Sequence, residues 1–565
     1  MVTTQQLVGH LKVCLIAIAI VFFLAENLSA QQSTVGLLEY SQDGQQGGYV
    51  LFAPTFSTKT YLINKCGEQV HSWDSKYKPG FTVSLLNDGS ILRSGVVENQ
   101  VFNAPGGGGI IEKITWDNDI EWTYTISDST MLQHHAIAPM PNGNVLALVW
   151  EFKTMDEAID QGRNPDKVGN SIWSEKIIEI KPTGSNSGTI VWEWKLWDHL
   201  IQNFDNETDN FGAISDNPHR IDVNYVNSTN PDEPDWIHAN AIDYNADLDQ
   251  ILISAHSFNE IWVIDHSTTT QEAAAQFGGN SGKGGDIIYR WGNPAAYERG
   301  TPSDKKLFGQ HNPHWISRGL PDEGAIMIFN NGMRRIGNYS SIDIITPPID
   351  IHGNYQLEDN KSYSPAQPKW TYTDSIRSNF FAFNQSGAQR LPNGNTLVCA
   401  SPSGTFFEID KDKKTIWKYV SPVSIAGITK QGEKPYGNTA FRAELYTENF
   451  PAFNGKDLTD GMPIELEPGI SLCSTSSIEN SDTQKNDVEV YPNPTGHLLF
   501  VKIGIKNPIT KLSIINTLGE EINKEFVRLS VDLYSIDVHD IPMGMYTLNI
   551  YGTQLADSRR VMIMR

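Results

Sequence analysis

The chain has 565 residues, of which 39% are hydrophobic and 10% aromatic, so it can form a large core and is not a disordered chain. Its 66 acidic and 43 basic residues give a formal net charge of -23. A surface this acidic repels phosphate backbones, and we expect no nucleic-acid partner. An anionic substrate would need a local cationic pocket, so basic residues near a cleft are informative here.

The N-terminal segment carries a short apolar run, residues 13–24, between Lys12 and Leu28-Ser29-Ala30. A short apolar core followed by small residues is typical of a secretory signal peptide. A membrane anchor is the alternative, but a bilayer span needs about 20 residues. We therefore predict a signal peptide over residues 1–30, and no transmembrane segment once it is removed.

Three cysteines remain after this segment, and they allow at most one disulfide. Sequence alone leaves all three pairings of Cys66, Cys399 and Cys473 open. No CxxC pair or Cys/His spacing is present, so a zinc site is not expected.

Two elements recur along residues 31–473 and predict one repeating unit. The first is a tight turn entering a strand, as in LLNDGSIL (85–92), MPNGNVLALVW (140–150), LPDEGAIMIF (320–329) and LPNGNTLVC (391–399), with a looser copy at 244–254. Asn-Gly and Asp-Gly between apolar runs are strong hairpin signals. The second is a strand that ends in tryptophan, at Trp73, Trp122, Trp192, Trp291, Trp370 and Trp417.

Six such strands predict an all-β fold, a six-bladed β-propeller, because each blade packs a periodic aromatic residue against the next. A β-sandwich, the alternative, rarely repeats one unit six times. The segments 152–172, 198–234 and 267–287 are rich in Asn, Asp, Gly and Pro and are expected to be surface loops at one mouth of the propeller.

The C-terminal part has a different character. A polar linker over residues 474–488 precedes short alternating strands that predict a small β-sandwich over residues 489–565. This tail resembles the C-terminal sorting domain of the type IX secretion system, through Tyr491-Pro492-Asn493-Pro494-Thr495, Asn516-Thr517-Leu518-Gly519 and Gly544-Met545-Tyr546. The resemblance implies a host of the Bacteroidota type, the secretion machinery as partner, and a location outside the cell or on its surface. A carbohydrate-binding or adhesive module is the alternative.

Three histidines stand six residues before the start of a repeated turn. They are His134, His238 and His314, and the same count elsewhere gives Gln385 and Gly80. Equivalent residues of a propeller converge on its axis, so we predict that these histidines line one channel, with His135, His311 and Asn240 beside them. Hydrogen-bonded structural histidines are one alternative, and a three-histidine metal site is another that lacks an obvious carboxylate partner.

Two arginines follow a strand and a tight turn, Asn330-Asn331-Gly332. Arg334 and Arg335 carry guanidinium groups, which match tetrahedral oxyanions and stay charged. In so acidic a chain they indicate an anion clamp, although a surface ion pair is an equal alternative.

Seven segments in the expected order are similar to the bacterial arylsulfotransferase family, from about residue 45 to about residue 465. They are DWIHANAIDYNADLDQILIS, EIWVIDHSTTT, DIIYRWGNP, QHNPHWI, IFNNGMRR, SGAQRLPNGNTLV and GTFFEIDKDKKTIWKYVSP. The resemblance implies a secreted six-bladed propeller that moves a sulfuryl group from a phenolic sulfate ester to a phenol. It also implies no nucleotide donor, and the chain has no Gly-rich phosphate loop. We therefore expect no cofactor and no metal.

The resemblance also assigns site residues. His238 and His311 match two active-site histidines of the family, and Arg335 matches its sulfate-binding arginine, with Arg334 in that role if the turn is shifted by one. Asn240, Asn331 and Arg334 are expected to contact substrate.

The family's nucleophile is a further histidine from a later blade. Here no histidine lies between His352 and His497, and the corresponding segment reads FFAFNQSGAQRL. On sequence grounds His314, and after it His134, could take this role.

Two other functions remain open. One is a non-catalytic propeller that binds a ligand at the cell surface, and the other is a metal-dependent ester hydrolase. The alternating Asp243, Asn245, Asp247 and Asp249 suggest a calcium loop, but the Gly and distal Glu of that loop are missing, so we expect a simple turn.

Overall fold

The computed structural model describes residues 33–225, 230–469 and 471–473, and in the C-terminal part residues 488–503, 509–516, 521–522, 524–530, 532–552 and 555–564. The expected signal peptide and nearly all of the expected linker lie outside the described residues. The chain forms two compact units, residues 1–473 and 474–565. Within the described ranges, no helix has the length and apolar character needed to cross a membrane.

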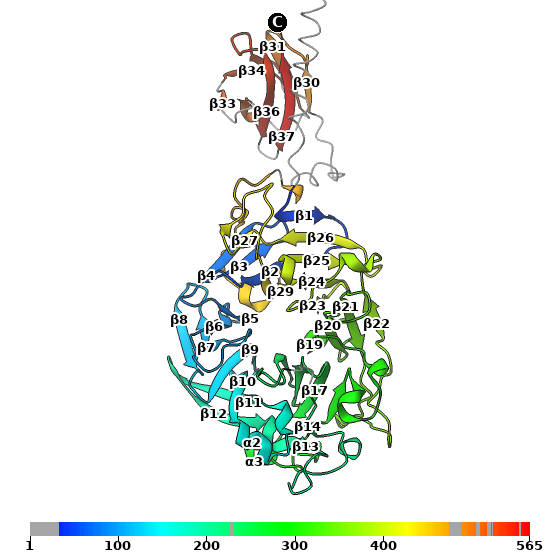
Figure 1. Ribbon diagram of the computed structural model, residues 1–565. Coiled ribbons are helices and arrows are strands. Elements are labelled where there is room, and N and C mark those ends of the chain that lie inside the picture. The colour runs from blue at the N-terminus through cyan, green and yellow to red at the C-terminus, as the bar shows by residue number, and fades with distance from the viewer. Residues whose placement is uncertain are drawn as a thin grey trace, which may run out of the picture. The chain divides into compact units, whose positions relative to one another are not determined.

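The first unit is built from six antiparallel sheets of at least four strands each (Figure 1). The first sheet contains β2 (Tyr49–Pro54), β3 (Lys59–Asn64), β4 (Gln69–Asp74) and β29 (Ala440–Tyr446), and the second contains β5 (Pro79–Leu85), β6 (Ile91–Val96), β7 (Gly109–Ile114) and β8 (Ile120–Thr125). The third contains β9 (Met131–Pro139), β10 (Val145–Thr154), β11 (Ser171–Gly184) and β12 (Ser187–Lys195), and the fourth contains β15 (Ala239–Asn245), β16 (Gln250–Ala255), β17 (Glu260–Asp265) and β18 (Tyr289–Trp291). The fifth contains β19 (His311–Trp315), β20 (Ile326–Asn330), β21 (Ser341–Ile345) and β22 (Trp370–Tyr372), and the sixth contains β23 (Gly387–Arg390), β24 (Thr396–Ala400), β25 (Thr405–Ile409), β26 (Thr415–Val420) and β1 (Gly36–Tyr40).

One strand of each sheet belongs to an inner ring. The strands β5, β9, β15, β19, β23 and β29 contact one another in this order, and β29 contacts β5 again. Figure 1 shows the sheets following one another around this ring. Short elements fill the connections: β13 (Leu200–Ile201), β14 (Ile221–Asp222), β27 (Val423–Ser424), β28 (Gly427–Ile428), α2 (Met155–Asp160) and α3 (Thr270–Ala273).

The repeated tryptophans occupy the fourth strand of every sheet, on β4, β8, β12, β18, β22 and β26. Four of them donate an indole N–H to an acceptor distant in sequence: Trp122 to Ser187 O, Trp192 to Thr268 Oγ1, Trp291 to Pro365 O and Trp417 to Lys65 O. A buried indole N–H needs such a partner, so the aromatic residue both fills space and fastens neighbouring segments. The chain is mostly β, as predicted, and the six tryptophan strands are confirmed.

Both ends of the first unit close the ring. β1, near its N-terminus, pairs with β26 of the last sheet, and β29, from its C-terminal part, is the inner strand of the first sheet. A disulfide joins Cys66 to Cys473 across 407 residues, and Cys399 is a buried free thiol. Of the three pairings that the sequence left open, this is the one that forms.

The inner strands contain β-bulges that set which side chains reach the middle of the ring. Gln133 and Ile137, four residues apart on β9, face Val149 and Ala147, which are two apart. The bulge on β15 has fewer extra residues: Ala239 and Ile242, three apart, face Ala255 and Ile253, which are two apart. A residue with positive φ stands at or beside the bulge or strand start of five inner strands: Phe81, His135, His238, Asn312 and Gln385. Because bulges redirect side chains, counting residues from the turns does not give equivalent positions.

The second unit has two four-stranded antiparallel sheets. One contains β30 (Glu489–Tyr491), β31 (Leu498–Lys502), β35 (Leu533–Asp537) and β34 (Phe526–Arg528), and the other β33 (Glu521–Ile522), β32 (Ile509–Ile515), β36 (Gly544–Gly552) and β37 (Leu555–Ile563). Leu499 and Ile536 from the first sheet and Leu512 and Leu548 from the second belong to one buried cluster. The two sheets therefore share a core of their own.

Candidate functional site

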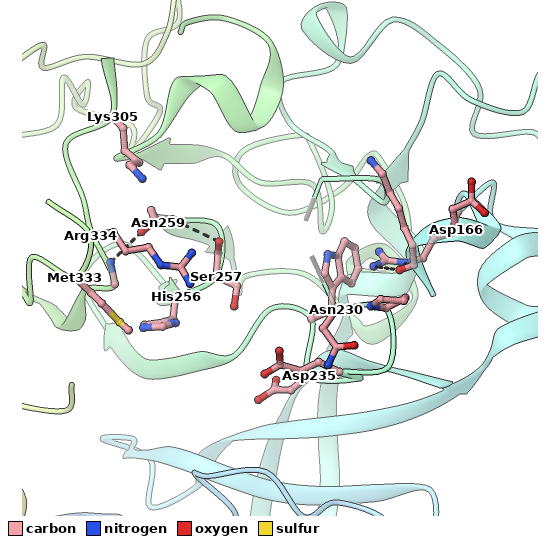
Figure 2. Close-up of a pocket in the computed structure, with 15 residues that line it drawn as sticks. Asp166, Asn230, Asp235, His256, Ser257, Asn259, Lys305, Met333 and Arg334 are labelled. Atoms are coloured by element: carbon pink, nitrogen blue, oxygen red, sulfur yellow. Dashed lines mark hydrogen bonds between the residues drawn. The ribbon is translucent and has the colours of Figure 1, made fainter. Parts of the chain in front are cut away.

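A cavity of about 600 Å³ lies among the loops of the third, fourth and fifth sheets (Figure 2). Its walls come from the segment after α2, the segment before β15, the turn between β16 and β17, and the segments before β19 and after β20. Arg334, Lys305 and His256 belong to one part of the wall, and Asp166 and Asp235 to another. This volume suits a small organic ligand.

Four imidazole rings form a row beside this cavity. The ring centroids are 4.5 Å apart for His135 and His238, 5.1 Å for His238 and His256, and 5.4 Å for His256 and His311. Two of the predicted site histidines, His238 and His311, are thus brought together. His256 stands between them, and its place was not foreseen.

His238 is paired with a carboxylate. Its Nδ1 lies 2.5 Å from Asp235 Oδ2, three residues earlier in the chain. Burial opposes protonation of the ring, but the charge of Asp235 and its hydrogen bond outweigh burial and raise the pKa of His238. His238 is therefore the ring of this row that readily carries a positive charge.

His311 is held by hydrogen bonds at both nitrogens. Its Nε2 accepts the backbone N–H of Gln385 at 3.2 Å, so the proton is on Nδ1, which donates to Asn331 Oδ1 at 2.8 Å. Burial lowers the pKa of His311 to about 3. Asn331 donates in turn to the carbonyl oxygens of Ala382 and Gln385. His311 and Asn331 thus form one rigid network.

His134 points away from the cavity into its own sheet. It is fully buried, its Nε2 lies 2.9 Å from Glu175 Oε2, and its ring stacks on Trp150. Its Nδ1 lies 3.0 Å from Nδ1 of His135. Burial lowers the pKa of His134 to about 3 and raises that of Glu175. His134 supports His135 rather than reaching a ligand itself.

His314 lies in a second cavity, of about 240 Å³, which the inner strands line. The bulge on β19 explains why His314 and His311 do not lie in the same cavity. His314 pairs with Met327 on one side of the bulge, and His311 pairs with Phe329 on the other. The equal count from the turns therefore does not place His134, His238 and His314 in one cavity. Asn240, which the sequence predicts to contact substrate, is fully buried, and its side-chain amide donates to Gln310 O.

The two arginines after β20 point in different directions. Arg334, with φ +64, is exposed and lines the 600 Å³ cavity. Arg335 donates to Ser341 Oγ at 3.1 Å and lies over the rings of Phe308 and Tyr339. Burial is the main cause that lowers the pKa of Arg335. Positive φ at Arg334 turns the chain, so the first arginine of the pair is the one that faces the cavity.

Lys305 stands with Arg334 as a second cation on this wall. Burial, and after it the charge of Arg334, lowers the pKa of Lys305. Among the described residues, neither cation has an acidic partner within 4.0 Å. Two cations that face a cavity without acidic partners can bind an anion through charge-assisted hydrogen bonds. In a protein with so acidic a surface, few other places attract an anion.

Three residues of this site escaped the sequence analysis: Asp235, His256 and Lys305. Asp235 could have been found from its spacing of three from His238 in the segment DWIH. His256 follows β16 directly and Lys305 lies in a loop, and neither carries a local signal. Within the described ranges, no group of three His, Cys, Asp or Glu side chains is arranged to hold a metal ion.

A separate cluster links the third and fourth sheets. His266 Nδ1 lies 2.6 Å from Asp249 Oδ1 and its Nε2 lies 3.1 Å from Glu179 Oε2. Burial opposes protonation, but the two carboxylates outweigh it and raise the pKa of His266 to about 9. His266 is therefore an imidazolium that bridges two sheets.

This cluster predicts a pH-dependent stability. A raised pKa means that the folded state gains stability from the proton below pH 6.5, and that this gain is lost as pH rises towards 9. The shift corresponds to about 3 kcal/mol. His266→Gln should therefore lower the free energy of unfolding near pH 6 and differ much less from wild type above pH 9, as measured by denaturant unfolding. His352→Gln, an exposed site, is the control. A pH-independent difference would contradict the assignment.

The ring of antiparallel sheets and the polar cavity beside its inner strands define a propeller-like, β-rich protein with a cavity among its loops. Residues 118–444 match the arylsulfotransferase (ASST) family model, and this match covers more than half of the chain. The protein belongs to the arylsulfotransferase family. Residues 489–564 match the secretion system C-terminal sorting domain, which indicates secretion or display at the cell surface.

Similar solved structures include a protein of unknown function from Bacteroides caccae (11% identity, TM-score 0.37, covering 70% of this chain and 98% of that one). A streptogramin B lyase shares 14% identity at TM-score 0.32, covering 74% and 96%. The β-propeller domain of Cps50 (Swd1) from Myceliophteria thermophila shares 8% at 0.31, covering 69% and 86%. No curated protein matches the sequence significantly.

Proposed function

We propose that this protein transfers a sulfuryl group from an aryl sulfate ester to a phenolic acceptor, without a nucleotide donor. The observation that carries the proposal is the pair of unpaired cations, Arg334 and Lys305, in the wall of the cavity beside the imidazole row. Membership in the arylsulfotransferase family supports it. The catalytic unit would be residues 31–473, a six-bladed β-propeller, joined by a linker at 474–488 to a sorting domain at 489–565.

The geometry suggests a role for each group. Sulfuryl transfer resembles phosphoryl transfer, in which charge develops on the peripheral oxygens and catalysis is mainly positioning and electrostatic stabilisation. Arg334 and Lys305 would hold the sulfate oxygens. His238, protonated through Asp235, would donate a proton to the leaving phenolate oxygen and recover one from the acceptor phenol. His311, fixed by Asn331 and Gln385, would keep the imidazole row in place.

The test is an assay with 4-nitrophenyl sulfate as donor, with and without phenol and with and without a chelator. We expect nitrophenolate release that depends on phenol and is unaffected by the chelator. Release that needs no phenol and stops with the chelator would point instead to a metal-dependent hydrolase. No release under any condition would favour a propeller that only binds ligands.

A further inference from the structure

His256 differs from the other imidazoles of the row in what surrounds it. It is the only histidine in the described wall of the 600 Å³ cavity. No described residue forms a hydrogen bond with either of its ring nitrogens. A Cβ added to Gly309 would lie 3.2 Å from His256 Nε2, so the missing side chain at Gly309 leaves space beside this nitrogen. His256 therefore presents a free lone pair to the cavity.

The protonation state of His256 agrees with this role. Burial, and then the charges of His238 and His311, lower the pKa of His256 well below 6.5. The ring is thus neutral at neutral pH, and a neutral imidazole is the form that attacks an electrophile. Arg334 belongs to the same part of the cavity wall (Figure 2), where it can hold a sulfate group next to the ring.

The other histidines of the row and of the sequence prediction lack this combination, and His135 contacts His134 through Nδ1 and is not part of the described cavity wall. His238 uses Nδ1 for Asp235 and is the protonated member of the row. His311 has both nitrogens engaged, and His134 is sealed between Glu175 and His135. His314 belongs to the other cavity.

The segment FFAFNQSGAQRL supplies no substitute. The side chain of Gln385 accepts a hydrogen bond from Ser401 Oγ, and its backbone N–H is donated to His311. Gln385 is therefore committed to the scaffold of the site.

We propose that His256 is the nucleophile of the transfer reaction, an inference that rests on the proposed function. Its Nε2 attacks the sulfur of the aryl sulfate, an N–S bond forms, and the S–O bond to the aryl group breaks. The aryl oxide leaves with the proton of His238. In the second half, the acceptor phenol gives its proton to His238 while its oxygen attacks sulfur, and the N–S bond breaks to release the new ester and neutral His256.

The experiment uses the mature full-length protein and 4-nitrophenyl sulfate without acceptor. We expect a burst of about one nitrophenolate per protein, and mass spectrometry of a digest kept at neutral to alkaline pH should place one added SO₃ group on His256. His256→Gln should abolish burst and adduct and lower kcat on the order of 1,000-fold or more. The matched control His352→Gln should leave both unchanged. His256→Ala should regain turnover when imidazole is added, which separates loss of the nucleophile from misfolding.

The outcomes separate the two proposals. An adduct on another histidine, or an unchanged burst in a folded His256→Gln protein, would overturn the role of His256 while leaving sulfuryl transfer intact. Phenol-dependent turnover without any burst or adduct would do the same, because it indicates direct transfer. Absence of turnover in the wild-type protein would overturn the proposed function itself.

Discussion

Arg334→Ala is expected to lower kcat/KM for aryl sulfates by about 100-fold or more. Removal of one preorganised donor from a developing oxyanion typically costs this much. Arg334 is exposed to the cavity, and no described acidic residue pairs with it, so in the proposed reaction it is free to bind the sulfate group. Lys305 remains in the variant and should retain part of the binding. Steady-state kinetics with 4-nitrophenyl sulfate and phenol would measure the loss.

The neighbouring arginine is the matched control. Arg335 lies against Phe308 and Tyr339 and donates to Ser341 Oγ. Arg335→Ala should therefore lower the melting temperature and reduce activity less than Arg334→Ala. The reverse order of activity losses, with both proteins folded, would show that the second arginine holds the sulfate and that the loop turns on substrate binding.

His238→Gln is expected to lower kcat by at least about 100-fold, because general acid catalysis contributes on that scale. The pH dependence of kcat gives a sharper test of this role. The pKa of His238 is raised, so a rate that needs the imidazolium falls as pH rises through a value above 6.5. Asp235→Asn removes the main stabilising charge and should move this falling limb to lower pH.

The control for this pair is Asp166→Asn. Asp166 also lines the cavity but pairs with no histidine among the described residues, so the pH profile of kcat for Asp166→Asn should match that of the wild type. If Asp235→Asn left the falling limb in place, His238 would not be the acid of the reaction.

Much of the architecture could be predicted from sequence, because it depends on local signals. Turns such as Asn142-Gly143 recur in five of the six sheets and the tryptophans occur once in each, and both report short-range structure. The site residues depend on longer-range geometry. The bulges on β9 and β19 shift the register by different amounts, so His314 moved to the other cavity and His134 into its sheet.

The arginine pair shows in the same way that sequence does not predict which of two adjacent side chains faces the cavity. Sequence identified a cationic turn after β20, but only the positive φ at Arg334 decides which guanidinium faces the cavity. His256 has no local motif, and it joins the row only because the fold places it between His238, which directly precedes β15, and His311 on β19. The row of imidazoles is therefore a property of the ring of strands, not of one segment.

The disulfide has a mechanical consequence. The second unit is attached to the first through Cys473, and Cys473 is itself bonded to Cys66 in the first sheet. A force applied to the second unit would therefore pass through covalent bonds into the turn between β3 and β4. It bypasses β29, the inner strand that completes the first sheet. The bridge therefore fixes the C-terminal end of the first unit to the turn between β3 and β4, independently of the hydrogen bonds that hold β29.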